Sequence, residues 1–201
     1  TLEGFYTVLK DAFIQDPNGS DSFGDIFIKR NGPSAIVSGF TLENRLALDN
    51  RIQLESGFTI QSSLYDQAIS YSENLFKRKD FLKTPNNYGY ATLIYNPIKS
   101  VNFSFNYIYT GEMVLLHLAG SSNQLNDEYV ISPVFNEMGF KATYTSRLNR
   151  VGVDIDYSIG VKNLTNTYQQ DFGKYKNRDS NFIYGPSAPR TYYLGLVLKS
   201  I

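Results

Sequence analysis

The sequence predicts an all-β chain that forms the wall of a transmembrane antiparallel β-barrel. Apolar and polar residues alternate with a period of two along most of the chain, which is typical of strands with one face in lipid. Short and long connections between these segments also alternate. The 201 residues include 16 Tyr and 14 Phe, and aromatic side chains favour strands and gather at the interfaces of membrane barrels.

The strands predicted in the first half of the chain differ in how cleanly they alternate. The cleanest segment is 51–63, where Ile52 and Leu54 fall on one side and Gln53 falls on the other. The segment 4–14 alternates least. The predicted strands of this half are 4–14, 35–48, 51–63 and 90–95, with a short extra ribbon at 26–29.

The second half of the chain shows the same alternation. Near its start Val101 and Phe103 oppose Asn102 and Ser104, and the last strand has an apolar residue at every second position. The predicted strands of this half are 101–110, 138–148, 151–164 and 191–200.

The connections between these strands sort into two kinds. The tight turns are predicted at Asp49-Asn50, Asn96-Pro97 and Asn149-Arg150. The long connections are 15–34, 64–87, 111–136 and 165–190. Short turns on the periplasmic rim and long loops on the outer rim are the arrangement of outer-membrane barrels.

Composition excludes several other classes of protein. The chain has no Cys, so it can form neither a disulfide framework nor a thiolate metal site. Its 19 basic and 19 acidic side chains cancel, so bulk charge does not draw it to nucleic acid. No apolar run approaches the roughly 18 residues that a membrane helix requires.

The order of residues toward the end of the chain resembles the extreme C-terminus of TonB-dependent outer-membrane receptors of the Bacteroidetes type. The likeness is most specific in 160–168 and 184–195, and weaker echoes extend over most of the chain. Asn side chains and Pro suit strand-to-loop transitions, so we expect these residues to be structural. The residues that carry the likeness are Asn163, Asn166, Tyr168, Gly185, Pro186, Pro189 and Arg190.

This resemblance implies a bacterial outer-membrane location and an active transporter rather than an enzyme. Such receptors have a 22-stranded barrel around an N-terminal plug, which the inner-membrane TonB complex pulls to admit a nutrient. Residues 1–201 would then be the C-terminal eight strands, with the plug outside this sequence. The likeness favours an iron-siderophore, haem or cobalamin as the small-molecule ligand over the glycans that related importers take. Outer-membrane lipids would surround the wall, and whether a surface lipoprotein caps it stays open.

Four residues are candidates for contact with a ligand in or beside the predicted outer loops. His117 is the single histidine of the chain, and imidazole is a common metal or haem ligand; the alternative is that it packs in the loop between its leucine neighbours, which a single histidine favours. Lys77 and Arg78 belong to a basic stretch that could attract an anion or could be a solvated loop. Tyr109 precedes the long connection 111–136.

A calcium site is a further hypothesis for the connection 16–25. Asp16, Asn18 and Asp21 place oxygen atoms around a glycine, as calcium loops do. Turn formation accounts for the same residue types, and no bidentate Glu closes the loop. We expect no other cofactor.

Two alternative functions follow from the same pattern. Eight strands can close into a small barrel that acts as an adhesin or anchor, in which case 4–14 must pair with 191–200. An outer-membrane hydrolase would require a nucleophile beside a base, and no serine motif lies near His117 in the sequence.

Overall fold

The structure is a computed structural model that describes residues 1–22, 24–120, 124–174, 178–179, 182–186 and 188–200. The fold is all-β and antiparallel. Within these residues, no helix has the length and apolar character needed to span a membrane. The strands are β1 (Leu2–Leu9), β2 (Phe13–Asp21), β3 (Gly24–Asn31), β4 (Ala35–Leu48), β5 (Ile52–Ile69), β6 (Arg78–Asp80), β7 (Asn87–Ile98), β8 (Val101–Thr110), β9 (Val114–His117), β10 (Glu128–Ile131), β11 (Phe135–Leu148), β12 (Val153–Lys162) and β13 (Thr191–Ser200).

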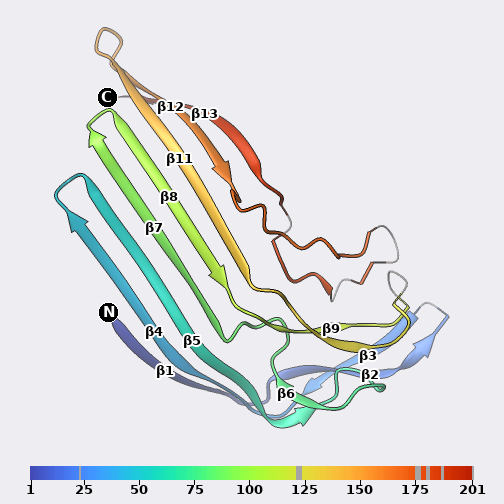
Figure 1. Cartoon of the computed structure of the whole chain (residues 1–201). Coiled ribbons are helices and arrows are strands. Elements are labelled where there is room, and N and C mark those ends of the chain that lie inside the picture. The colour runs from blue at the N-terminus through green and yellow to red at the C-terminus, as the bar shows by residue number, and fades with distance from the viewer. Residues whose placement is uncertain (23, 121–123, 175–177, 180–181, 187, 201) are drawn as a thin grey trace.

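One large sheet contains all eight of the predicted long strands. Its order is β1-β4-β5-β7-β8-β11-β12-β13, and the short β6 pairs with β5 beside it. Each long strand therefore pairs with the long strands that precede and follow it in the sequence, as in a meander (Figure 1). The bounds of β8 and β13 are those predicted from the sequence.

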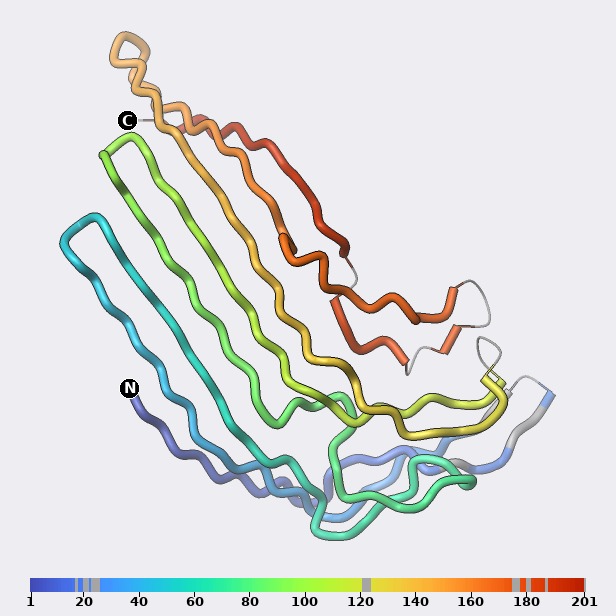
Figure 2. Tube along the Cα trace, in the orientation of Figure 1, coloured from blue at the N-terminus to red at the C-terminus, as the bar shows by residue number. Residues whose placement is uncertain are grey.

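The tight and long connections lie at opposite ends of the sheet. The turns β4–β5, β7–β8 and β11–β12 gather at one end, together with both chain termini (Figures 1 and 2). The long connections extend from the other end. The predicted sorting of the loops is thus confirmed, and we call the end with the long connections the outer rim.

The second tight turn lies slightly later than predicted. β7 ends at Ile98, and the turn is at 99–100, so the turn predicted at Asn96-Pro97 is wrong. The register of β7 against β8 shifts across Asn96-Pro97, which marks a β-bulge. A bulge accommodates proline because the ring nitrogen cannot donate to a regular ladder.

The predicted loop 15–34 is largely a hairpin, so both that loop and the continuous strand 4–14 are wrong. β1 ends at Leu9, Asp11 adopts a positive φ of 53°, and β2 and β3 then form a separate two-stranded sheet. Gly32 N–H donates to the Ala12 carbonyl at 2.8 Å where the chain returns. The Asp, Pro, Asn and Gly residues of this segment are typical of turns, and only pairing makes them a strand. The predicted ribbon 26–29 lies within β3 and is confirmed.

The predicted long loops also contain three short strands. β6 adds to the outer part of β5, and β9 pairs with β10 in a two-stranded sheet. Each has only three or four residues. Such strands are too short to show a period in the sequence, so pairing rather than pattern identifies them.

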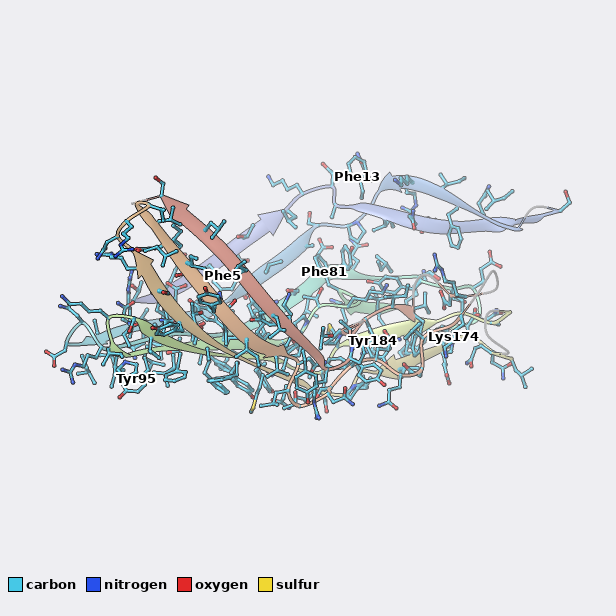
Figure 3. All side chains as sticks on the ribbon, turned by 90° about the horizontal axis from the view of Figure 1, so that it is seen from above. Phe5, Phe13, Phe81, Tyr95, Lys174 and Tyr184 are labelled. Carbon is cyan, nitrogen blue, oxygen red and sulfur yellow. The ribbon has the colours of Figure 1, made fainter. Side chains whose placement is uncertain are left out.

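The register gives the large sheet one apolar and one polar face. Ile159 lies opposite Leu194 on one face, and Asp154 lies opposite Lys199 on the other. In Figure 3, Phe5 marks the polar face and Tyr95 marks the apolar face. Ion pairs on the polar face near the tight turns are Arg45–Glu55 at 3.1 Å, Arg147–Asp154 at 3.0 Å and Lys199–Asp156 at 2.5 Å.

Two glycines on the polar face are needed for close approach of tyrosine rings. A Cβ atom at Gly57 would lie 2.5 Å from the Tyr90 ring, and one at Gly160 would lie 2.4 Å from the Tyr193 ring. Each tyrosine is the cross-strand partner of its glycine. An aromatic ring that covers a cross-strand glycine replaces packing that the glycine lacks and helps to fix the register.

Among the described residues, a buried apolar cluster lies outside the large sheet, at the outer rim. Met113, Leu115 and Phe182 form it, with Val130 and Tyr184 packed against them. By contrast, the apolar face of the sheet is open, and its members are Leu194 (83% exposed), Tyr192 (71%) and Phe40 (67%) among others. An apolar surface of this extent marks contact with lipid or protein.

The large sheet is not closed. Within the described residues β1 pairs in the sheet only with β4, and β13 pairs only with β12. The pairing of 4–14 with 191–200 that a self-closed eight-stranded barrel requires is therefore not formed, and that alternative is wrong for this structure.

Asn163 holds the connection between β12 and β13, residues 163–190, in place at its start. Its φ is 50°, its side chain is buried, and its amide donates to the carbonyls of Thr167 at 3.0 Å and Ala188 at 2.9 Å. Its Oδ1 accepts from Thr167 N–H at 3.0 Å and from the Thr165 hydroxyl at 3.2 Å. One side chain thus ties both ends of this connection together.

Asn166 and Arg190 complete this fastening. Asn166 has a φ of 54°, and its Oδ1 accepts from Arg190 N–H at 2.9 Å. The Arg190 guanidinium donates to the Leu164 carbonyl at 2.9 Å, and the Pro189 carbonyl accepts from the Thr191 hydroxyl at 3.0 Å. We call Asn163, Asn166 and Arg190 the terminal clasp.

We predict that Asn163→Ala loosens the last connection. The change leaves the carbonyl of Ala188 and the N–H of Thr167 without their partner and places Ala in a left-handed conformation, at a cost of about 2–3 kcal/mol. Hydrogen exchange at 165–169 and 188–190 should accelerate markedly. Asn149→Ala, in an exposed tight turn, is the control; equal exchange in the two variants would contradict the role of the clasp.

Candidate functional site at the outer rim

The described residues of the three connections 70–86, 111–134 and 163–190 form a hydrogen-bonded unit that we call the loop layer. Asp127 lies at one of its junctions. Its carboxylate accepts from the Ser72 hydroxyl, from Asn74 Nδ2 at 3.1 Å and from Ala119 N–H at 2.8 Å. Burial acts to raise the pKa of Asp127, but these three hydrogen bonds outweigh it and hold the pKa below its ordinary value.

Gln169 and Asp171 organise the last connection. Gln169 is buried; its amide donates to the Phe182 carbonyl at 2.8 Å, and its Oε1 accepts from Tyr184 N–H at 2.9 Å and Gly185 N–H at 3.3 Å. The Pro186 carbonyl accepts from Gln169 N–H at 3.0 Å. The Tyr184 hydroxyl donates to Asp171, and burial together with this carboxylate raises the pKa of Tyr184. Sequence reasoning missed Gln169 and Asp127, because neither belongs to a recognisable motif.

Tyr168 and the remaining motif residues lie where this connection turns back on itself. Tyr168 is half-buried beside Gln169. A Cβ atom at Gly185 would lie 2.5 Å from the Phe135 ring, so only glycine fits there. The motif residues described here thus have structural contacts that fix the course of the backbone between β12 and β13.

His117 is engaged within the loop layer. It ends β9, and its ring stacks on Phe182 with centroids 3.9 Å apart and an interplanar angle of 10°. Its Nδ1 lies 3.8 Å from Glu128 in β10, and only 16% of its side chain is exposed. Leu118 N–H donates to Asp179 at 3.0 Å next to it. The imidazole therefore helps to join the β9–β10 hairpin to the last connection.

The two predicted basic residues, Lys77 and Arg78, lie in different environments: Arg78 packs against aromatic rings, and Lys77 is exposed to solvent. Arg78 lies in β6, bonds to Asp80 at 2.8 Å and stacks over the rings of Phe76 at 5.6 Å and Tyr129 at 5.2 Å. Lys77 is exposed and lines a cleft beside the β2–β3 hairpin. Of the two cations, Lys77 is the one available to a ligand.

Tyr109 does not lie in an outer loop. It belongs to β8 and lies opposite Gly89 on the apolar face of the sheet. Its hydroxyl donates to Asn87 Oδ1 at 2.8 Å, and its ring lies 5.9 Å from the Phe58 ring. The structure therefore separates Tyr109 from the other ligand candidates.

The candidate calcium residues lie in strand β2 rather than in a loop. The Asp16 carboxylate pairs with Arg30 across the hairpin, and Asn18 is exposed. The side chain of Asp21 lies outside the described residues. Across the part of the chain that is described, no group of three or more His, Cys, Asp and Glu residues could hold a metal ion. Calcium at 16–25 stays a prediction.

Two clefts separate the β2–β3 hairpin from its neighbours. The polar cleft has a volume of about 610 Å³ and lies against the end of β5 and the following loop; it is lined in part by Asp16, Arg30, Asn31, Gln67, Glu73 and Lys77. The second has a volume of about 420 Å³ and lies against the loop layer; it is lined in part by Phe27, Tyr71, Ser72, Leu118 and Asp127. Glu73 lines both, so the clefts are adjacent.

Comparison with known proteins identifies the fold. No family model and no curated protein matches the sequence. The structure is similar to the ferric-catecholate import receptor Fiu from E. coli K12, with a TM-score of 0.63 and 17% identity over 96% of this chain and 24% of that one. It is also similar to FpvA of P. aeruginosa, solved with bound ferric pyoverdine (TM-score 0.65, 12% identity, 96% and 24% covered).

A third similar structure is the copper transporter OprC, with a TM-score of 0.62 and 14% identity over 97% of this chain and 28% of that one. The chain thus spans about a quarter of the length of each protein it is similar to. The open, antiparallel sheet matches their barrels over nearly all of its own length. By its fold, the chain resembles part of the barrel wall of these receptors and transporters, together with the long connections at one end of that wall.

Proposed function

We propose that this chain is part of a TonB-dependent active transporter in the bacterial outer membrane, which imports a scarce nutrient such as an iron-siderophore, haem or cobalamin. The observation that carries the proposal is the match of 96% of the chain to a quarter of an import receptor. The inner-membrane TonB complex would act through a plug that is not among these residues.

The two faces of the sheet support a division of roles in this transporter. The apolar face would contact lipid, and the polar face, with its ion pairs, would line the interior around the plug. The exposed backbone edges of β1 and β13 would pair with further strands, since an unpaired edge in lipid leaves donors and acceptors unsatisfied.

The hydrogen-bonded loop layer supports capture of a ligand at the outer rim. Asp127, Gln169 and the terminal clasp hold three connections in one arrangement before any ligand arrives. A binding surface that is already ordered loses less conformational entropy on binding.

The transport proposal is tested first by the intact mass of the protein extracted from its native outer membrane, followed by uptake. We expect a mass several times the 22.8 kDa of this sequence. Uptake of ferric siderophore, haem or cobalamin should fall to background when the gene or TonB is deleted. A mass near 22.8 kDa would favour a small adhesin or anchor, and TonB-dependent uptake of a glycan alone would move the protein to the glycan importers.

A matched pair of substitutions in β13 tests the assignment of the faces. Leu194→Arg places a charge on the apolar face and should destabilise the membrane-inserted protein by about 2–4 kcal/mol. Val197→Arg, on the polar face, should cost far less. The amounts of folded protein in the outer membrane and the unfolding midpoints in lipid vesicles measure this; equal losses would refute the assignment.

The loop layer should loosen in acid through Asp127. Because hydrogen bonds hold the pKa of this carboxyl below its unfolded value, its contribution to stability is complete above the unfolded pKa and is lost as the pH falls through the folded pKa. The protection of the Ala119 amide, measured as its exchange rate relative to that of an unstructured amide at the same pH, should therefore fall in acid. In Asp127→Asn, this protection should be lower at neutral pH and should lose its dependence on the carboxyl titration, and a pH profile of protection unchanged by the substitution would contradict this role.

A further inference from the structure

The polar cleft has two distinct walls joined at their base. Asp16, Arg30 and Asn31 come from the β2–β3 hairpin, and Gln67 and Glu73 come from the end of β5 and the loop after it. In Figure 3 this hairpin, marked by Phe13, is an arm set apart from the segments that carry Phe81 and Tyr184. The cleft therefore lies between two independent parts of the outer rim.

The base of the cleft is closed by a hydrogen bond between the two walls and is lined by apolar side chains. Asp66 N–H donates to the Ser34 carbonyl at 2.8 Å, which joins the walls where they meet. Ile14 and Ile69, one from each wall, are only 6% and 7% exposed and line the cleft. A Cβ atom at Gly32 would lie 2.6 Å from Ile14, so glycine is needed for the chain to pass this floor.

Some of the charged side chains on the walls have ion-pair partners within the protein, and others do not. Arg30 pairs with Asp16. Within the described residues, Lys77 and Glu73 form no hydrogen bond or ion pair, although both line the same cleft. Their neighbours Arg78 and Asp127 are each held by several partners.

The amides on the walls add neutral hydrogen-bonding capacity. Gln67 lies on one wall and Asn31 on the other, and neither side chain has a hydrogen-bond partner among the described residues. Each primary amide offers donors and an acceptor. The cleft therefore presents a cation, an anion and two amides around an apolar floor.

We propose that the polar cleft binds a short peptide or peptide-like group that carries an anionic and a cationic end. Lys77 would pair with the carboxylate, Glu73 with the ammonium, and the amides of Gln67 and Asn31 with the peptide bonds between them. A purely anionic ligand would leave Glu73 uncompensated, and a neutral one would use neither charge. The proposal rests on the proposed import function and names the chemistry that the importer recognises.

The test uses the full-length receptor purified from the outer membrane, with tetraglycine as the probe. N-acetyl-tetraglycine lacks the cationic end, and tetraglycine amide lacks the anionic end. Isothermal titration calorimetry should give the tightest binding for tetraglycine, with each blocked form weaker by about tenfold, as expected for the loss of a charge-assisted hydrogen bond.

Substitutions assign each end to a residue. Lys77→Gln should reduce tetraglycine to the affinity of the amide form and leave the amide form unaffected. Glu73→Gln should reduce the affinity for tetraglycine to that for N-acetyl-tetraglycine and should leave the affinity for N-acetyl-tetraglycine unchanged. Lys99→Gln, in the exposed turn at the opposite rim, is the control and should bind as the unmodified protein does. Equal affinities for the three probes, or no effect of either cleft variant, would overturn the proposal.

Uptake separates this inference from the import function. If ligand uptake depends on TonB but is unchanged in Lys77→Gln and Glu73→Gln cells, the transporter stands and the peptide site fails. If tetraglycine binds with the expected order of affinities but neither radiolabelled peptide nor ferric siderophore, haem or cobalamin enters the cells in a TonB-dependent manner, the site stands and the import function fails.

Discussion

The register of the backbone ladder is the constraint on which the rest of this structure depends. Pairing across the eight long strands places apolar residues opposite one another, such as Ile159 and Leu194, and charged residues opposite one another, such as Asp154 and Lys199. A slip of one residue would reverse every side chain. The bulge at Asn96-Pro97 absorbs an irregularity in β7 without disturbing the rest of that strand.

The outer rim is organised by different forces. Its apolar cluster around Leu115 and Phe182 is small, and hydrogen bonds of polar side chains link most of the loops to one another. Asp127, Gln169 and Asn163 each bond to backbone or side chains far away in sequence or across one connection. Gln169 and Asn163 are themselves buried, so their bonds satisfy polar groups that are removed from water, and the order of the loops comes from hydrogen bonding as much as from apolar burial.

Residue pattern predicted the long strands that have one apolar and one polar face, and failed where a strand is short or rich in turn-forming residues. The bounds of β8 and β13 were predicted correctly because an apolar residue stands at every second position along each of them. β2 was missed because Asp16 and Pro17 are typical of turns, and β9 because four residues show no period. In the candidate site, the sequence singled out Asn163 and Asn166 of the clasp and also Lys77, whose predicted ligand contact stays a prediction. It did not single out Asp127 or Gln169, whose partners are distant along the chain.

The sequence by itself determined the fold class, the sorting of tight and long connections, and the residues of the terminal clasp. These follow from local chemistry: a period of two, turn-forming side chains, and an Asn that tolerates positive φ. The tertiary structure alone decided that Arg78 packs inward while Lys77 stays free, that His117 stacks on Phe182, and that the hairpin β2–β3 walls a cleft. These outcomes depend on contacts between segments that the chain brings together only on folding, and no local pattern encodes such contacts.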